Sequence, residues 1–345
     1  MTQNGMRPLA PEALARLAAE ETDSRVFRTD MLDRLRRVVH FEWYAWVLTD
    51  PLTTVGVDPL ADVPDLSALP RVIQLKYLTT INRWSTLDVA AALGEHSIES
   101  PLWRDAQRAL GVVDVASVVF RDRYGCWGFL DLWSKREFAP DDIARLRELA
   151  PGLTAALRLR QARTFKVVAA GSDRHVAGPV VLLLRDDLVI LGQTAASDDW
   201  LRVLLPQQSG SSPIPACAYN VAAQVLARES GVDDHEPMAR THLADGFWVT
   251  LRASRVEPSN LIAVTIEQSA PDERLDLYAR VHGLSDREHQ LLGLLAQGSD
   301  TAQAASRMFL SPHTIQDHLK SVFTKTGTRS RRVLLSHALG TQGRS

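Results

Sequence analysis

The chain has 345 residues, more than one typical domain holds, so we expect two or three domains. Hydrophobic residues make up 45% and charged residues 23%, which is typical of a globular protein and excludes a collagen-like, low-complexity or disordered chain. The longest apolar runs, such as 180–184, are far shorter than the roughly 20 residues that cross a bilayer. No secretory signal is visible, and the distant Cys126 and Cys217 are expected to be buried thiols, with a redox pair as the less favoured alternative. The composition predicts a cytoplasmic protein without a membrane partner.

The net charge of −2 is unevenly distributed along the chain. Residues 283–345 hold eight Lys or Arg and four Asp or Glu, a net charge of +4, whereas the rest of the chain holds 31 and 37, a net charge of −6. A basic end on an acidic body fits a polyanionic partner that meets only that end. An ordinary solvated surface can carry the same excess, so charge alone does not decide between the two.

Residues 1–24 predict one accessory amphipathic helix, and residues 25–164 predict a first domain that mixes helices and strands. The expected elements of this domain are a helix over 27–39, a strand over 41–48, a hairpin of strands 115–121 and 126–133, and a long helix after Pro140 that Pro151 should kink or divide.

Part of this first domain resembles the end of a GAF domain. The resemblance covers about 45 residues and rests on Ser117-Val-Val-Phe, Gly125-Cys-Trp-Gly-Phe-Leu-Asp-Leu, Phe138-Ala-Pro-Asp-Asp, Leu149-Ala and Ala155-Ala-Leu. GAF domains are similar in their closing hairpin, their F-x-x-x-D element and a terminal helix that often mediates dimers. The resemblance therefore implies a sensory α+β domain over 25–164.

Residues 165–270 predict a second mixed domain. Strands are expected over 180–185, 188–193, 246–254 and 260–268, with a short helix over 195–204 and a loop rich in Ser, Pro and Gly over 207–215. This order of elements resembles a PAS domain, which implies a second sensory α+β unit built on an antiparallel sheet.

After a linker helix over 271–283, residues 284–345 predict four short helices with clear boundaries. Ser285 and Glu288 form a capping box, Asp300 and Gln303 cap a second helix, and Ser311 with Pro312 opens a third. Glycines end the first and third helices, and Ser330 opens the fourth; the glycines are Gly298 and Gly327. Two short helices joined by a tight connection at 309–311 are what a helix-turn-helix needs.

The third helix can be oriented from its own sequence. Ile315, Leu319, Val322 and Phe323 form one apolar stripe that should face the core. The opposite face is polar and could bond to base edges in DNA, although a merely solvated face would look the same. Its expected members are His313, Asp317, Lys320, Ser321 and Thr324, with Gln316 at the edge.

The stretch from Leu284-Ser-Asp-Arg-Glu through Leu295-Ala-Gln-Gly and Leu310-Ser-Pro-His-Thr-Ile-Gln-Asp-His-Leu-Lys to Thr328-Arg-Ser-Arg closely resembles the LuxR-type helix-turn-helix family over about 55 residues. The resemblance implies a four-helix domain that dimerises through its last helix and inserts its third helix into the major groove of double-stranded DNA. By position, the base-reading residues would be Gln316, Asp317 and Lys320, and the residues near phosphates would be Thr314, Lys325, Arg329 and Arg331.

Two residues depart from the family pattern. Ala304 stands where a bulky aliphatic residue is usual, which should loosen the packing of the second helix on the third. Phe309 stands where glycine is usual in the turn, which implies either a turn without left-handed backbone or some strain.

Other candidate sites are less convincing. The run Asp233-Asp-His-Glu, with His242 nearby, could bind a metal, but a solvated loop is the favoured interpretation. Trp43, Trp46, Trp84 and Trp127 could line a pocket for an apolar effector, although tryptophans more often fill a core. No phosphate-binding glycine loop or catalytic motif occurs, so we expect neither a cofactor nor an enzyme.

The sequence thus predicts two α+β sensory domains, GAF-like and PAS-like, followed by an all-α four-helix LuxR-type domain over 284–345. We expect a DNA-binding transcription regulator, a homodimer that works with RNA polymerase and is modulated by an unidentified small-molecule effector. The alternative is a signalling scaffold whose C-terminal domain docks a protein instead of DNA.

Overall fold

The computed structural model describes residues 23–65, 67–165, 180–195, 216–244 and 247–340. Its contacts divide the chain into two compact units. The first consists of Met1–Arg160, Val180–Ala239 and Leu251–Thr265, and the second of Gln161–Pro179, Arg240–Thr250 and Ile266–Ser345. The predicted N-terminal helix, the loop over 207–215 and most of the predicted helix over 195–204 lie outside the described residues.

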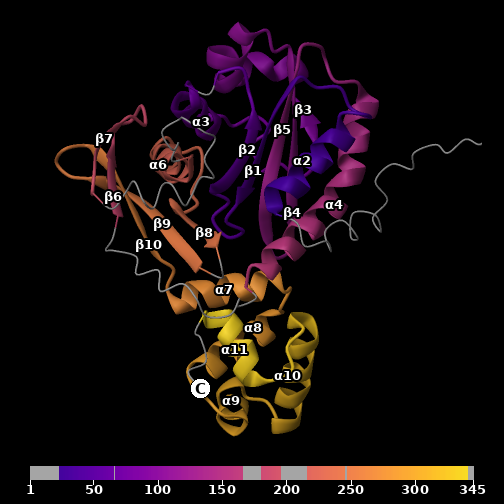
Figure 1. The fold of residues 1–345 in the computed structure, drawn as a ribbon, viewed down its shortest axis with the longest axis vertical. Helices are drawn as coiled ribbons and strands as arrows, with labels where there is room; N and C mark the ends of the chain where they lie inside the picture. Colours follow the sequence, from indigo (N-terminus) through magenta and orange to yellow (C-terminus); the bar gives the residue numbers. More distant parts are fainter. Residues whose placement is uncertain (1–22, 66, 166–179, 196–215, 245–246, 341–345) are drawn as a thin grey trace, which may run out of the picture. The chain divides into compact units, whose positions relative to one another are not determined.

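A five-stranded antiparallel sheet, with the strand order β2-β1-β5-β4-β3, forms the centre of the first domain (Figure 1). The predicted hairpin is confirmed, since Asp122 pairs with Gly125 at the turn between its two strands. The sequence prediction missed the second and third strands. The strands are β1 (Trp43–Thr49), β2 (Gly56–Asp62), β3 (Ala91–Ala92), β4 (Asp114–Asp122) and β5 (Gly125–Ser134).

Two helices pack together beside this sheet, α2 (Ser24–Leu35) and α4 (Pro140–Arg163) (Figure 1). The guanidinium of Arg160 in α4 lies 4.8 Å from the ring of Phe27 in α2. Of the two expectations at Pro151, the division was wrong, because the 24-residue helix α4 continues through the proline; a kink stays a prediction. Apolar side chains buried on both sides of the proline offset the lost hydrogen bond, which costs about 3 kcal/mol; they include Leu146, Leu153 and Leu157.

The rest of the first domain is α3 (Leu69–Leu78) and three short helical turns. The turns are η1 (Gly94–Glu99), η2 (Trp103–Gln107) and η3 (Arg108–Leu110), and the sequence predicted none of them.

A second five-stranded sheet has the order β7-β6-β10-β9-β8. When the strands are numbered in chain order within each sheet, both sheets have the same spatial order: second, first, fifth, fourth, third. Four of its strands were predicted, and β8 was not. The strands are β6 (Val180–Leu184), β7 (Ile190–Gln193), β8 (Met238–Ala244), β9 (Phe247–Val256) and β10 (Leu261–Gln268).

Helix α6 (Ala216–Glu229) is buried on every side from Ala216 to Ala227. It packs on α3 and β2, so it joins the first and second domains within the first compact unit. Its close approach requires the glycine at the start of β2, since a Cβ on Gly56 would lie 2.9 Å from Asn220 Nδ2. The polar residues of this stretch, Asn220 and Gln224, are buried as well, so no exposed polar face marks the helix in the sequence.

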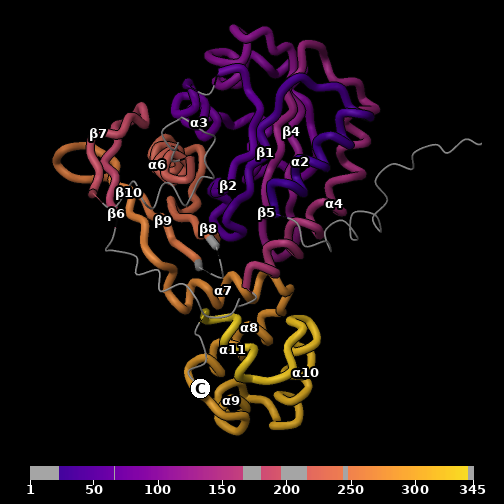
Figure 2. Tube along the Cα trace, in the orientation of Figure 1, coloured from indigo at the N-terminus to yellow at the C-terminus, as the bar shows by residue number. Residues whose placement is uncertain are grey.

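The second compact unit contains the predicted linker helix, α7 (Pro271–Val281), and all four predicted C-terminal helices (Figure 2). The helix boundaries lie at the expected caps. The helices are α8 (Asp286–Ala296), α9 (Thr301–Met308), α10 (Pro312–Thr326) and α11 (Arg331–Leu339). None of the described helices is both long and apolar enough to cross a membrane.

Helix α7 holds the C-terminal domain through an aromatic cluster. The ring of Phe165 stacks on Trp248 at 4.9 Å and meets Tyr278 edge-on at 5.4 Å. Arg274 of α7 lies 5.2 Å from the Phe165 ring and donates a hydrogen bond to the carbonyl of His337 at 3.1 Å. Since the last carbonyls of a helix lack partners within the helix, this bond caps α11 from outside.

Candidate nucleic-acid interface

Helices α9 and α10 are joined by a tight connection at 309–311. The Asp300 side chain accepts a hydrogen bond from the Gln303 amide at the start of α9, and the Ser311 hydroxyl accepts one from the Thr314 amide at the start of α10. Phe309 adopts left-handed backbone with φ 56° and ψ 42°. Its ring is 94% exposed, so no packing compensates the conformation. Of the two expectations for this turn, the strained one is confirmed.

Ala304, which stands where the family usually has a bulky aliphatic residue, lies in the core of the C-terminal domain. Ala304 is completely buried in α9, which packs on both α8 and α10. The small side chain is therefore part of the domain core, and the expected loosening of the packing stays a prediction.

The exposed face of α10 matches the predicted orientation, with one exception. Ile315, Leu319 and Val322 are buried, and Phe323 is half-buried. The exposed members define what we call the reading face: His313, Gln316, Asp317, Lys320 and Thr324.

Ser321, expected on the reading face, turns towards α8 instead. Its hydroxyl donates a hydrogen bond to Glu288 Oε1 at 2.6 Å, and Lys325 Nζ lies 2.6 Å from Glu288 Oε2. Oε2 also accepts a hydrogen bond from the Ser285 amide as part of the capping box. Burial alone would raise the pKa of Glu288, but the bonds from Lys325, Ser321 and Ser285 lower it to about 2. The carboxylate that caps α8 therefore also fixes α10.

The three predicted base-reading residues lie together on the reading face. Asp317 Oδ2 is 3.8 Å from His313 Nε2, so this pair forms an ion pair when the histidine is protonated. Among the residues that the structure describes, Gln316 and Lys320 have no side-chain hydrogen bond or ion pair. Their donors are thus available to an external acceptor.

The four residues predicted near phosphates are in different situations. Arg329 is exposed, whereas Arg331 donates hydrogen bonds to the carbonyls of Leu295 (3.2 Å) and Ser299 (2.6 Å). Lys325 is engaged by Glu288, and Thr314 Oγ1 lies 2.9 Å from Ser311 Oγ. Contact with phosphate stays a prediction for all four.

A hollow of about 320 Å³ lies along one flank of the reading face. The sequence prediction missed this hollow, because the hollow exists only when the Phe323 side chain stays partly exposed. Its lining residues are Gln316, Leu319, Lys320, Phe323, Thr324 and Thr328.

The tryptophans predicted as a candidate pocket mostly fill the core. Trp46, Trp84 and Trp127 are buried, and Trp43 is half-buried. Trp43 and Trp46 lie three residues apart on β1 and so face opposite sides of the sheet. The structure therefore does not bring the four side chains into one cavity, and effector binding stays a prediction.

Sequence reasoning missed a charged cluster on the central strand of the first sheet. Lys76 Nζ lies 2.6 Å from Asp131 Oδ2, and the Ser117 hydroxyl donates to Asp131 Oδ1 at 2.7 Å. The ammonium also lies 5.6 Å from the Trp84 ring and 5.3 Å from the Phe129 ring. The available signal was Asp131 itself, the one charged residue in the otherwise uncharged strand β5.

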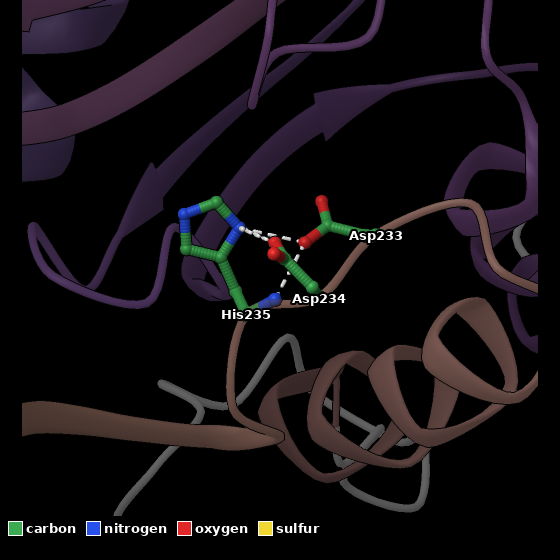
Figure 3. Close-up of side chains that lie close together, drawn as sticks. All are labelled: Asp233, Asp234 and His235. Atoms are coloured by element: carbon green, nitrogen blue, oxygen red, sulfur yellow. Dashed lines mark hydrogen bonds and ion pairs between the residues drawn. The ribbon is translucent and has the colours of Figure 1, made fainter.

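The candidate metal ligands Asp233, Asp234 and His235 do cluster (Figure 3), within 4.8 Å of one another. Asp234 is exposed, but the solvated-loop interpretation was wrong for Asp233, whose side chain is 2% exposed and paired with Arg83 at 2.8 Å. His235 Nδ1 lies 2.6 Å from the same carboxylate, which raises the pKa of the histidine. Asp233 pairs with both Arg83 and His235, so the buried part of the cluster is an ion-pair network. His242 packs its ring 5.4 Å from Trp248.

The geometry of α8–α11 defines a helix-turn-helix domain, with α9 and α10 as its paired helices. Residues 282–338 match the family model of bacterial regulatory proteins of the luxR family, so this domain is of LuxR type. A similar protein is the DNA-binding transcriptional activator DevR/DosR of Mycobacterium tuberculosis (strain ATCC 25618 / H37Rv), 41% identical over 49 residues. These residues are 14% of this chain and span only 23% of that relative's length.

Two solved structures of SdiA align along most of the chain. The crystal structure of Escherichia coli SdiA covers 95% of this chain and 95% of its own at 13% identity and a TM-score of 0.31. SdiA in complex with octanoyl-rac-glycerol covers 95% of this chain and 91% of its own at 13% identity and a TM-score of 0.29. Scores this low do not establish a shared fold for the N-terminal domains.

Proposed function

We propose that the protein is a transcription regulator that binds a specific sequence of double-stranded DNA through α10. The observation that carries the proposal is the reading face, where Gln316 and Lys320 present unengaged donors on the second helix of a LuxR-type helix-turn-helix. Lysine can donate to guanine O6 and N7, and glutamine can bond adenine with both ends of its amide. Asp317 can accept from cytosine N4, or reject other sequences through repulsion.

The DNA-bound form is a homodimer that contacts two half-sites about one helical turn apart. Helix α11 supports this proposal, because it buries Leu334 and Ala338 in its own domain and leaves Val333 41% exposed. Its exposed side is therefore available for a second copy. Arg329, exposed before α11, is the strongest of the four candidate phosphate contacts.

The two N-terminal domains act as sensory domains, GAF-like over 25–164 and PAS-like over 165–270, that modulate DNA binding in the cytoplasm. The shared strand order of their sheets supports a related origin for both domains, and the order hairpin, helix, three strands in the second matches the PAS pattern. An effector could bias DNA binding only through a difference in its affinity for the active and inactive states. RNA polymerase is the expected protein partner, and the chain itself is not an enzyme.

Selection of bound sequences from a random DNA pool tests the function. The full-length wild type should enrich a two-fold symmetric motif, and Lys320→Ala should lose preference at one base pair per half-site, a discrimination worth about 1–3 kcal/mol. Arg287→Ala is the matched control, since it removes an exposed cation from α8 and should leave the motif unchanged.

The affinity for the selected site should fall steeply with salt, because phosphate contacts release counterions. If the full chain enriches no sequence even at low salt, the proposal is wrong, and a scaffold that docks a protein partner becomes the better explanation.

A further inference from the structure

The hollow beside the reading face combines an apolar floor with a polar rim. Leu319 is 8% exposed and Phe323 is half-buried, so the floor is made of hydrocarbon. Gln316 and Lys320 stand at the exposed rim. The hollow is therefore continuous with the face that we propose to read DNA.

The remaining polar groups of the hollow are already satisfied. The Thr324 hydroxyl donates to the Lys320 carbonyl at 2.9 Å, and the hydroxyls of Thr326 and Thr328 lie 2.8 Å apart. Among the described residues that line the hollow, only the Gln316 amide and the Lys320 ammonium keep unengaged side-chain hydrogen-bond donors. An occupant must accordingly be apolar where it meets the floor and must carry hydrogen-bond acceptors where it meets the rim.

In the major groove, the thymine methyl is the one apolar group at a base-pair edge, and it lies next to acceptors such as thymine O4 and guanine O6 and N7. The hollow of about 320 Å³ is open to solvent along the reading face, so a base edge with its methyl can reach the floor. The positive charge of Lys320 favours a polyanion over an apolar peptide.

We propose that this hollow receives the 5-methyl group of a thymine, with Phe323 and Leu319 as the specificity-determining contacts. The inference rests on the proposed function, and it adds that each half-site contains a thymine beside the base pair bonded by Lys320. Phe323 thereby reads a base without any hydrogen bond.

Deoxyuridine provides the test, because it differs from thymine only by the missing methyl. Each thymine of the selected half-site is replaced singly, and the affinity of the full-length protein is measured at one salt concentration. We expect one position per half-site at which deoxyuridine weakens binding about 3- to 10-fold, the effect of one buried methyl group. Phe323→Ala should bind thymine and deoxyuridine equally at that position.

Phe309→Ala is the matched control, since it removes an equally large ring outside the hollow and should keep the wild-type preference for thymine. The wild-type measurement decides the question even if Phe323→Ala fails to fold.

Sequence-specific binding without a thymine in the half-site, or with no sensitivity to deoxyuridine, overturns the inference and leaves the proposed function standing. A change of oligomeric state in Phe323→Ala, with wild-type binding insensitive to deoxyuridine, assigns the hollow to a protein contact and overturns it too. If the wild type binds no specific DNA at all, the proposed function itself is wrong.

Discussion

Glu288 Oε2 lies 2.6 Å from Lys325 Nζ, although the two residues are 37 positions apart and sit on different helices. The same carboxylate closes the capping box at the start of α8 and accepts a bond from Ser321 of α10. One buried carboxylate therefore fixes both the start of α8 and the rotation of α10 about its axis. The reading face depends on this contact, because Ser321 and Lys325 on one flank fix which residues α10 exposes on the other.

Replacing this charge should weaken the C-terminal domain. We expect Glu288→Gln to lower the free energy of unfolding by about 2–3 kcal/mol at pH 7, since the native pKa of about 2 lies below the ordinary value of 4.5. A lowered native pKa stabilises the fold above pH 4.5, and this contribution is lost as the pH falls from 4.5 towards 2. The difference between wild type and variant should therefore shrink at pH 3. Urea unfolding of wild type and variant at both pH values measures this difference in stability. Hydrogen exchange of the amides in α8 and α10 assigns the difference to the C-terminal domain.

Glu137→Gln is the control for the loss of a carboxylate, because Glu137 is exposed, and it should change stability by less than about 0.5 kcal/mol. An equal difference between wild type and Glu288→Gln at pH 7 and pH 3 would contradict the assigned role of the charge.

The turn before α10 should tolerate and even favour glycine. Phe309 has a φ of 56° and a fully accessible ring, so it bears a left-handed penalty of about 1–2 kcal/mol that glycine avoids. Glycine gains about 0.5–1 kcal/mol of entropy in the unfolded chain, and we expect a net stabilisation of about 0.5–1 kcal/mol for Phe309→Gly. Thermal unfolding of α9 and α10, monitored by hydrogen exchange, shows whether Phe309→Gly raises the stability. Phe309→Ala, which keeps the strained backbone, should stay near wild type; destabilisation by glycine would show that the ring has a packing role.

The two arginines before and within α11 should separate binding from stability. Arg329 is exposed, so Arg329→Ala should weaken DNA binding uniformly across sequences and reduce the salt slope by about 1, without changing stability. Arg331 bonds the carbonyls of Leu295 and Ser299, so Arg331→Ala should cost about 1–3 kcal/mol of stability. Salt titrations of DNA affinity and unfolding curves, measured on both variants, distinguish the two roles. Identical behaviour of the variants would contradict the assignment.

The C-terminal helices were predictable because their signals are local. Ser285, Asp300 and Ser311 each bond an amide three residues away, so the helix starts can be read from short spacings. The exposed face of α10 was predictable with one exception. The apolar stripe shows which side of the helix faces the core, but it does not show which helix packs against each edge of that stripe. Ser321 was misplaced for that reason: it faces α8, whose position depends on the whole domain.

The contacts between the first two domains could not be predicted in this way. Arg83 and Asp233 are 150 residues apart, and no local pattern links them. Helix α6 is buried over 216–227, and its polar residues Asn220 and Gln224 are buried too, so their spacing does not mark a solvent-exposed face. Both features depend on tertiary packing and become visible only in the folded chain.

The Arg83–Asp233 ion pair should be among the strongest single contributions to the first compact unit. Both side chains are 2% exposed and 2.8 Å apart, and Arg83 also lies 4.6 Å from the Trp84 ring. Burial alone would raise the pKa of Asp233, but bonds from His235 and Ser85 and the charge of Arg83 hold it well below its usual range. Removal of Asp233 leaves the Arg83 charge buried without its carboxylate, which costs about 3–5 kcal/mol. Removal of Arg83 should cost less, because Asp233 keeps its bond from His235.

We therefore expect Arg83→Met and Asp233→Leu to destabilise strongly alone but less than additively together. Intrinsic tryptophan fluorescence during urea unfolding measures all four members of this double-mutant cycle, and a coupling of at least 1 kcal/mol is expected. Asp234→Asn, which changes the exposed neighbouring carboxylate, should cost less than about 0.5 kcal/mol. Additive effects would mean that the two charges are stabilised separately. Coupling would show that the ion pair links the loop after α6 to the segment after α3, in addition to the packing of α6 on α3.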